Sequence, residues 1–143
     1  MTTAISMATF FFAANIALGV FSPYLSTRAL AMKIIPQLRA DDTIAIYDEY
    51  DASSSVAFYT HRQVLIWNGR RNNLAAGSYY PDAPHIFLTD AEFPALWSGS
   101  KRVFLFVPAE QREEAKKRLP TAGTYLLAES GGKALYSNQP GAF

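Results

Sequence analysis

The chain opens on a long apolar run. Between residues 4 and 21 no side chain is charged, and the first charged residue of the chain is Arg28. The polar side chains inside the run are Ser6, Thr9 and Asn15. A helix over this run rises about 27 Å, close to the ~30 Å hydrocarbon thickness of a bilayer. The pattern predicts one transmembrane helix over residues 1–27, with Tyr24 at the lipid–water interface.

Two other interpretations of this run stay open. Ala29-Leu30-Ala31 has the small-x-small form of a signal-cleavage site, although the run lacks a positive n-region and exceeds the usual length of an h-region. A core helix of a soluble protein usually carries a polar stripe, which this run lacks. Because no Lys or Arg precedes the run, the positive-inside rule does not decide which side of the membrane the following residues occupy.

After the run, residues 28–40 have apolar side chains at helical spacing. The apolar face consists of Leu30, Ile34 and Leu38. This spacing predicts a juxtamembrane amphipathic helix, which Pro36 should bend or end because proline has no N–H to donate. The remaining residues 41–143 have the size of one ordinary domain, and we expect them to form a soluble α/β domain.

Within residues 41–143, short apolar runs alternate with helical patterns. Strands are predicted at residues 43–48, 63–67, 86–88 and 102–107, and on either side of Ser130-Gly131-Gly132. Helices are predicted after a cap at Asp51 or Ser53, between a cap at Thr89 or Asp90 and Trp97, and over residues 109–119 after Pro108. Residues 70–85 should be irregular, because turn formers and two prolines fill them.

This order of elements predicts the fold class. Strand–helix–strand units join parallel strands, whereas a tight turn joins antiparallel ones. The sequence therefore predicts an α/β fold with an open, mostly parallel sheet and a C-terminal antiparallel hairpin, preceded by one N-terminal transmembrane helix.

Composition and missing motifs narrow the function classes. The net charge of +1 predicts no nucleic-acid partner, and the absence of cysteine excludes disulfides, thiolate catalysis and cysteine-bound metal. No Gly-rich phosphate loop follows the first predicted strand, no Gly-x-Ser-x-Gly elbow is present, and the two histidines stand apart. We therefore predict no catalytic, cofactor-binding or metal-binding residue.

Acidic side chains follow the first predicted strand, at the edge where open α/β sheets bind ligands. Asp48, Glu49 and Asp51 are suited to a divalent cation or a sugar hydroxyl. The serines of residues 53–55, at a predicted helix start, are suited to a phosphate, which the neighbouring carboxylates would repel. The structural alternative is helix capping beside a solvated acidic loop.

A basic and aromatic loop follows the second predicted strand. Arg70 and Arg71 share this loop with Tyr79 and Tyr80. Bidentate arginine contacts would suit lipid phosphates or a polyprenyl phosphate, and a plain polar surface loop is the alternative.

A second basic pair, His61 and Arg62, lies between a predicted helix and a strand. It is interpreted either as an anion or headgroup contact or as an exposed turn. Together with the loops described above, the candidate ligand or carrier contacts are Asp48, Glu49, Asp51, His61, Arg62, Arg70, Arg71, Tyr79 and Tyr80.

Four stretches of the chain resemble a known family. They are "YDASSSVAFYTHRQVLIWNG", "IFLTDAEFPALW", "KRVFLFVP" and "YLLAESGGKALYSNQP". They resemble the C-terminal, non-membrane domain of bacterial membrane glycosyltransferases, the family of the aminoarabinose transferase of lipid A and the protein O-mannosyltransferases. The features that carry the resemblance are Ser55, Phe58, Tyr59, Trp97 and Ser137-Asn138. These are patterns of packing and turns that extend over nearly the whole chain, and none is a catalytic signature.

The resemblance implies a periplasmic domain that caps a multi-helix body in the bacterial inner membrane. That body takes a sugar from a polyprenyl-phosphate carrier and transfers it to a lipid or protein acceptor. The family's catalytic acidic residues lie in a loop near the start of the membrane body, and nothing in this chain matches that loop. Residues 1–27 are then expected to be the last span of the body, in a gene fragment or a separate subunit.

The resemblance therefore implies an accessory domain without its own cofactor. Its expected partners are membrane lipid, an adjacent multi-span subunit and, through the larger transferase, the carrier-linked sugar. A self-sufficient membrane-anchored binding or interaction module of the cell envelope is the alternative, and a small soluble enzyme released by signal cleavage is a third interpretation.

Overall fold

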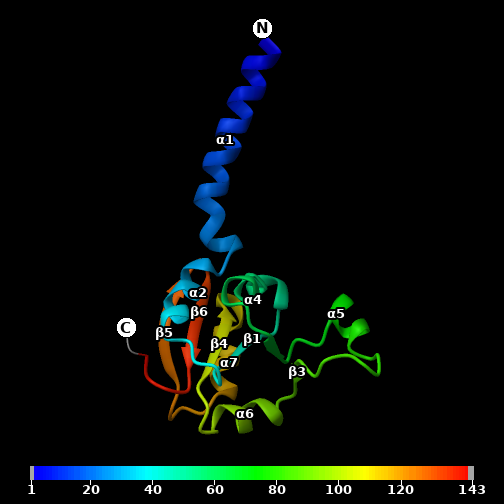
Figure 1. Cartoon of the computed structure of the whole chain (residues 1–143). Helices are drawn as coiled ribbons and strands as arrows, with labels where there is room; N and C mark the ends of the chain where they lie inside the picture. Colours follow the sequence, from blue (N-terminus) through cyan, green and yellow to red (C-terminus); the bar gives the residue numbers. More distant parts are fainter. Residues whose placement is uncertain (1, 142–143) are drawn as a thin grey trace.

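The fold consists of one long helix and an α/β domain attached to its end (Figure 1). The structure, a computed structural model, describes residues 2–141. The helices are α1 Thr2–Leu25, α2 Arg28–Ile34, α3 Tyr50–Ser53, α4 Ser55–Thr60, α5 Asn72–Gly77, α6 Glu92–Trp97 and α7 Arg112–Arg118, with 3-10 turns η1 Ile35–Gln37 and η2 Ala109–Gln111. The strands are β1 Thr43–Tyr47, β2 Val64–Trp67, β3 Phe87–Leu88, β4 Val103–Pro108, β5 Tyr125–Ser130 and β6 Lys133–Ser137.

The six strands form one sheet in the order β3-β2-β1-β4-β6-β5. The first four strands are parallel, and β6 and β5 are antiparallel additions beside β4. Crossover segments produce the parallel part because each returns the chain to the same end of the sheet. The predicted α/β fold with a mostly parallel sheet and a C-terminal antiparallel hairpin is therefore confirmed.

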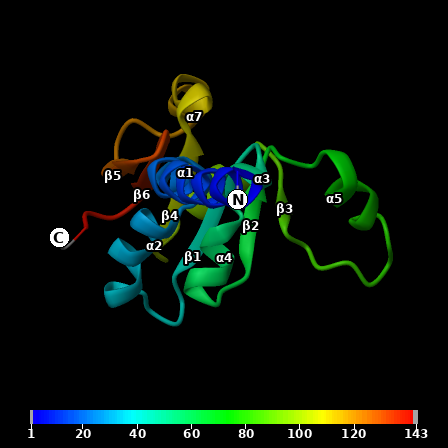
Figure 2. The same cartoon turned by 90° about the horizontal axis from the view of Figure 1, so that it is seen from above.

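Helices cover both faces of the sheet. In β1, Ile44 and Ile46 pack on one face, whereas Ala45 and Tyr47 pack on the other, as the two-residue period of a strand requires. Figure 2 shows α2 and α4 on one side of the sheet and α7 on the other, where α6 also packs. Because β4 lies between these two layers, all of its residues are buried.

The helix α1 lies outside this domain. Its stretch Thr3–Leu25 has a mean hydropathy of 1.9, and its most apolar window is not buried against any other part of the structure. A helix that is apolar on all sides needs an apolar environment around it. The helix therefore has the length and composition of a membrane-spanning helix, which agrees with the predicted N-terminal span.

The helix predicted over residues 28–40 is shorter than expected. The α-helical part, α2, ends at Ile34 and continues as the 3-10 turn η1. Pro36 lies in η1, where its missing N–H and its ring prevent further α-helix. On the predicted apolar face, Leu30 and Ile34 are fully buried and Leu38 is half buried.

One of the two predicted helix caps is formed. Thr89 Oγ1 accepts a hydrogen bond from the N–H of Glu92, and the Glu92 carboxylate accepts bonds from the N–H and the hydroxyl of Thr89. This reciprocal arrangement is a capping box, and its hydrogen bonds to Thr89 lower the pKa of Glu92. By contrast, the predicted helix with Val56 and Ala57 is α4, which begins without a side-chain cap, as does the preceding α3, so the predicted caps Asp51 and Ser53 are wrong.

The hairpin between β5 and β6 has a two-residue turn. Gly131 and Gly132 both have positive φ, at 54° and 69°, and Ser130 pairs directly with Lys133. Positive φ at both turn positions matches the twist of the flanking strands, and glycine adopts it without a Cβ clash. The predicted hairpin around Ser130-Gly131-Gly132 is confirmed.

The hairpin turn contacts the end of α1. A Cβ placed on Gly131 would lie 1.7 Å from the carbonyl oxygen of Pro23, so a larger residue does not fit here. Lys133 donates a 2.6 Å hydrogen bond from Nζ to the carbonyl oxygen of Tyr24. Burial lowers the pKa of Lys133, and the nearby Glu110 carboxylate opposes this shift.

These contacts orient the domain relative to α1. Thr27, which follows α1, donates its N–H to the hydroxyl of Ser55 at 2.9 Å, at the start of α4. Lys133 pairs with Pro108, the last residue of β4. Both the start of α4 and the end of β4 lie at the carboxyl edge of the parallel strands. That edge therefore faces the end of α1 (Figure 1).

Gly131→Ala should loosen the attachment of the domain to α1, because the added methyl group overlaps the Pro23 carbonyl. Gly132→Ala is the matched control, since it also has positive φ but its Cβ has no neighbour closer than 4.0 Å. The chain has no cysteine, so spin labels at Leu18→Cys and Thr121→Cys report the distance between helix and domain. We expect a broader distance distribution in Gly131→Ala; equal distributions in the two variants would contradict this docking.

Candidate functional site

A groove lies at the carboxyl ends of β1 and β2, between α3 and the segment that contains α5. Its volume is ≈ 580 Å³. In open α/β sheets, ligands bind at this edge, where the loops leave the strands. The groove is lined by Asp48, Glu49, Tyr50, Asp51, Gly69, Arg71 and Leu74. The structure thus brings the acidic stretch together with one of the two arginines of the following loop.

Asp48 is the buried charge of this groove. Its side chain is 2% exposed, and its Oδ1 lies 2.5 Å from Nη2 of Arg71. Burying a carboxylate is costly unless it is paired, and the Arg71 guanidinium, which is 56% exposed, supplies the opposite charge from the solvent side. The φ of Asp48 is 61°, which ends β1 at Tyr47, one residue earlier than predicted.

The end of β2 meets Asp48 through its backbone. The N–H of Asp48 donates a 2.8 Å hydrogen bond to the carbonyl oxygen of Trp67. A Cβ on Gly69 would lie 2.0 Å from the carbonyl oxygen of Asp48, so glycine is required for this approach. Gly69 therefore allows the chain to pass from β2 to Arg71 while it stays in contact with the end of β1.

The other two acidic residues do not join Asp48 in a metal site. Glu49 and Asp51 are exposed, whereas Asp48 is covered by Arg71. Among residues 2–141, no group of three acidic or histidine side chains is arranged to hold a metal ion. In the described part of the chain, this acidic stretch therefore does not gather three side chains around one point.

Two of the three serine hydroxyls beside the groove have partners within the chain. Ser53 is fully buried, and the hydroxyl of Ser55 lies 2.8 Å from that of Thr27. Ser54 donates its hydroxyl hydrogen bond to the carbonyl oxygen of Asp51. Ser55 therefore attaches the start of α4 to Thr27, and Ser54 closes the turn between α3 and α4.

Residues 70–85, predicted to be irregular, form an arm that contains the helix α5. Arg70 Nε donates a 2.8 Å hydrogen bond to Ser78 Oγ. The guanidinium carbon of Arg70 lies 4.5 Å from the centre of the Tyr79 ring, at cation–π distance. Tyr79 and Tyr80 are exposed and do not line the groove. The arm is thus held together by its own polar and aromatic contacts.

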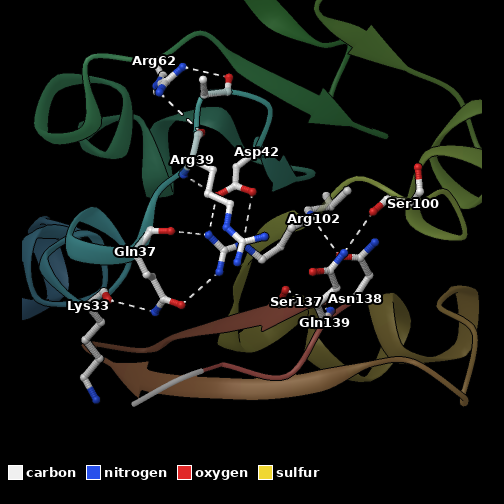
Figure 3. A network of polar contacts seen from close by, with 12 residues as sticks. Lys33, Gln37, Arg39, Asp42, Arg62, Ser100, Arg102, Ser137, Asn138 and Gln139 are labelled. Atoms are coloured by element: carbon white, nitrogen blue, oxygen red, sulfur yellow. Dashed lines mark hydrogen bonds and ion pairs between the residues drawn. The ribbon is translucent and has the colours of Figure 1, made fainter.

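His61 and Arg62 lie at the opposite edge of the sheet, between the end of α4 and the start of β2. His61 is exposed and ends α4 with a φ of 53°. Arg62 donates hydrogen bonds to the carbonyl oxygens of Ala40 and Arg39 at 3.2 and 3.4 Å (Figure 3). The structure does not bring this pair to the groove, and Arg62 stabilises the loop before β1.

A buried ion pair that the sequence analysis missed lies near Arg62 (Figure 3). Arg102 donates to the two carboxylate oxygens of Asp42, from Nη2 at 2.5 Å and from Nε at 3.1 Å, and the two side chains are 8% and 1% exposed. Arg102 also donates to Gln37 Oε1 at 3.1 Å. Because Asp42 precedes β1 and Arg102 precedes β4, the pair joins the starts of two neighbouring strands. The sequence feature that could have predicted this pair is a charged residue directly before each of the two apolar runs.

Asn138, one of the residues that carry the family resemblance, forms hydrogen bonds near the start of β4, at the same edge as the Arg102–Asp42 pair (Figure 3). Its Oδ1 accepts a 2.8 Å hydrogen bond from the N–H of Val103. Its Nδ2 donates to the carbonyl oxygens of Trp97 and Lys101 at 2.8 and 2.9 Å. One amide therefore connects the end of β6 with the end of α6 and the start of β4.

Comparison with known proteins gives a fold relationship. No protein-family model and no curated protein sequence matches this chain. The fold is similar to that of ArnT from Cupriavidus metallidurans, in crystal structures bound to undecaprenyl phosphate and in the apo state. Each comparison has a TM-score of 0.61 and 15% sequence identity over 78% of this chain. The chain spans 19% and 20% of the length of those two ArnT chains.

Arg71→Gln should lower the free energy of unfolding by about 1–3 kcal/mol, because it leaves the Asp48 carboxylate buried without an opposite charge. Adding Asp48→Asn should recover most of that loss, since asparagine is uncharged and tolerates positive φ. Arg62→Gln, at the opposite edge, is the control for the loss of one arginine. Urea titrations followed by near-ultraviolet circular dichroism, in detergent, measure the wild type, the single variants Arg71→Gln, Asp48→Asn and Arg62→Gln, and the double variant. Additive losses in the double variant would show that the two side chains are not coupled.

Proposed function

We propose that this chain is an accessory extracytoplasmic domain of a membrane glycosyltransferase, which transfers a sugar from a polyprenyl-phosphate carrier to a lipid or protein acceptor. The observation that carries this proposal is the fold shared with ArnT, which has been crystallised with undecaprenyl phosphate. The resemblance of the sequence to bacterial membrane glycosyltransferases supports the same class. Lipid A is the lipid acceptor that this resemblance favours.

The anchor supports a location in the bacterial inner membrane, and the periplasmic side is the one that the resemblance implies for the domain. The helix α1 has the length and composition of a span and leads into the domain within two residues. Asn15 lies near the middle of α1, so its side-chain amide would lie in the hydrocarbon. Polar side chains at that depth favour a hydrogen bond to another helix. This arrangement supports α1 as the last span of a multi-helix body, in the same polypeptide or in an adjacent subunit.

The groove supports a positioning role without chemistry. Glycosyl transfer needs a positioned acid or base beside the reacting oxygen. The buried carboxylate, Asp48, is held by Arg71, and among the described residues no histidine lines the groove. The exposed Glu49 and Asp51 offer hydrogen-bond acceptors to a sugar or headgroup. We infer that the groove orients an acceptor or a carrier for a catalytic loop elsewhere in the transferase.

A second candidate is a self-sufficient membrane-anchored binding module of the cell envelope. The groove favours the binding module. Its volume is ≈ 580 Å³, and its carboxylates and guanidinium are the hydrogen-bond acceptors and donors that a polyol requires. This candidate predicts glycan binding by the chain on its own.

Inner-membrane vesicles from cells that lack this chain should lose transfer of the polyprenyl-phosphate-linked sugar, and fusion with liposomes that contain the full chain should restore it. The chain alone, with carrier-linked sugar and acceptor, should show no transfer because it has no assembled acid–base pair. Radiolabelled sugar in the acceptor fraction is the measurement. Turnover by the chain alone would overturn the accessory role, and unchanged transfer without the chain would favour the binding module.

The location can be tested with single cysteines in this cysteine-free chain. Tyr125→Cys, on the exposed part of β5, should react with a membrane-impermeant maleimide in intact spheroplasts. Thr3→Cys, at the other end of α1, should react after lysis, because a span separates the two positions. The reverse pattern would place the domain in the cytoplasm.

A further inference from the structure

The arm of residues 70–85 presents aromatic and apolar side chains to solvent. Tyr79 and Tyr80 are 71% and 69% exposed, and Leu74 is 38% exposed. Figure 2 shows the arm extending away from the sheet, beyond β3. Exposed aromatic side chains on a projecting segment are typical of a surface that contacts something outside the domain.

The arm is fixed at the point where it leaves the sheet. Arg71 is paired with the buried Asp48, and Gly69 packs against the backbone of the same residue. The hydrogen bond from Arg70 to Ser78 joins the residues on either side of α5. The direction in which the arm extends is therefore set by its attachment to the domain.

The arm lies near the edge of the domain that faces the end of α1. It begins at the carboxyl end of β2, and α4 begins at the same edge, where Ser55 bonds to Thr27. Figure 1 shows α5 at about the height of α4, in the part of the domain nearest to α1. With α1 crossing the bilayer as far as Leu25, α5 lies on the side of the domain that faces the lipid headgroups.

The chemistry of the arm suits that level. Tyrosine is enriched at membrane interfaces because its ring is apolar and its hydroxyl stays hydrated. The guanidinium of Arg70, stacked on the Tyr79 ring at 4.5 Å, adds a cation that attracts lipid phosphate. An interfacial contact would shield the Tyr79, Tyr80 and Leu74 side chains from water while the polar groups stay solvated.

We propose that the arm rests in the interface of the bilayer leaflet next to the domain, with Leu74, Tyr79 and Tyr80 in contact with phospholipid. A second contact beside α1 stops the domain from rotating about the helix axis. It also holds the mouth of the Asp48 groove close to the bilayer surface, where a lipid-linked ligand would arrive. This inference rests on the membrane anchoring in the proposed function and is independent of the transferase assignment.

Tryptophan probes in the full chain, reconstituted into phosphatidylcholine and phosphatidylglycerol vesicles, test the inference. Tyr79→Trp and Tyr80→Trp place the probe on the arm. Tyr125→Trp is the matched control, because Tyr125 pairs with Ser137 at the edge of the sheet away from α1. Phe12→Trp reports whether α1 is inserted. Each variant is measured in ordinary vesicles and in vesicles with brominated acyl chains, which quench nearby tryptophan.

The arm probes should lose fluorescence in the brominated vesicles and emit at a shorter wavelength than Tyr125→Trp, which should keep its intensity. The native Trp67 and Trp97 are buried and give the same background in every variant. Arm probes that stay unquenched while Phe12→Trp is quenched would overturn the inference and leave the anchor intact, as expected if the arm docks on another protein. An unquenched Phe12→Trp would overturn the anchor itself.

Discussion

A glycine at the tip of the β5–β6 turn lets the hairpin touch the end of α1, and the position of everything else depends on this contact. The last carbonyl groups of a helix have no intrahelical donor, and Lys133 supplies one to Tyr24 where Gly131 makes room beside Pro23. Because the hairpin turn lies at the carboxyl edge of the parallel strands, the same contact turns that edge toward the end of α1. One backbone requirement thus places the groove and the arm on the side of the domain that faces the end of α1.

An arginine–aspartate pair lies at each end of the parallel strands. The two pairs differ in whether the arginine stays accessible to a ligand. Arg102 and Asp42, at the edge away from α1, are both buried and hydrogen-bonded to each other through two bonds, so they join strands. At the carboxyl edge, Asp48 is buried but Arg71 is more than half exposed, and both line an open groove. The first pair stabilises the fold, and the second is placed where a ligand can compete for the guanidinium.

The similarity to ArnT concerns a part of a larger protein, and a shared fold does not carry a shared activity. What this chain offers is geometry: an apolar helix, a groove at the edge of the sheet that faces the end of that helix, and an arm with exposed tyrosines. In the proposed function, these features would position and orient a lipid-linked molecule. They suit a domain that works beside a catalytic centre in the membrane.

The sequence by itself determined the elements whose signal is local: the apolar span, the alternating strands and the Gly131-Gly132 turn, because hydrophobic period and positive φ are written in neighbouring residues. The tertiary structure decided which distant residues meet. It turned Asp48 inward to Arg71 and left the adjacent acids exposed, joined Arg102 to a residue 60 positions away, and placed Lys133 against Tyr24 across 109 positions. Periodicity along a chain carries no information about such pairs, since they depend on strand order and on how closely two backbones approach.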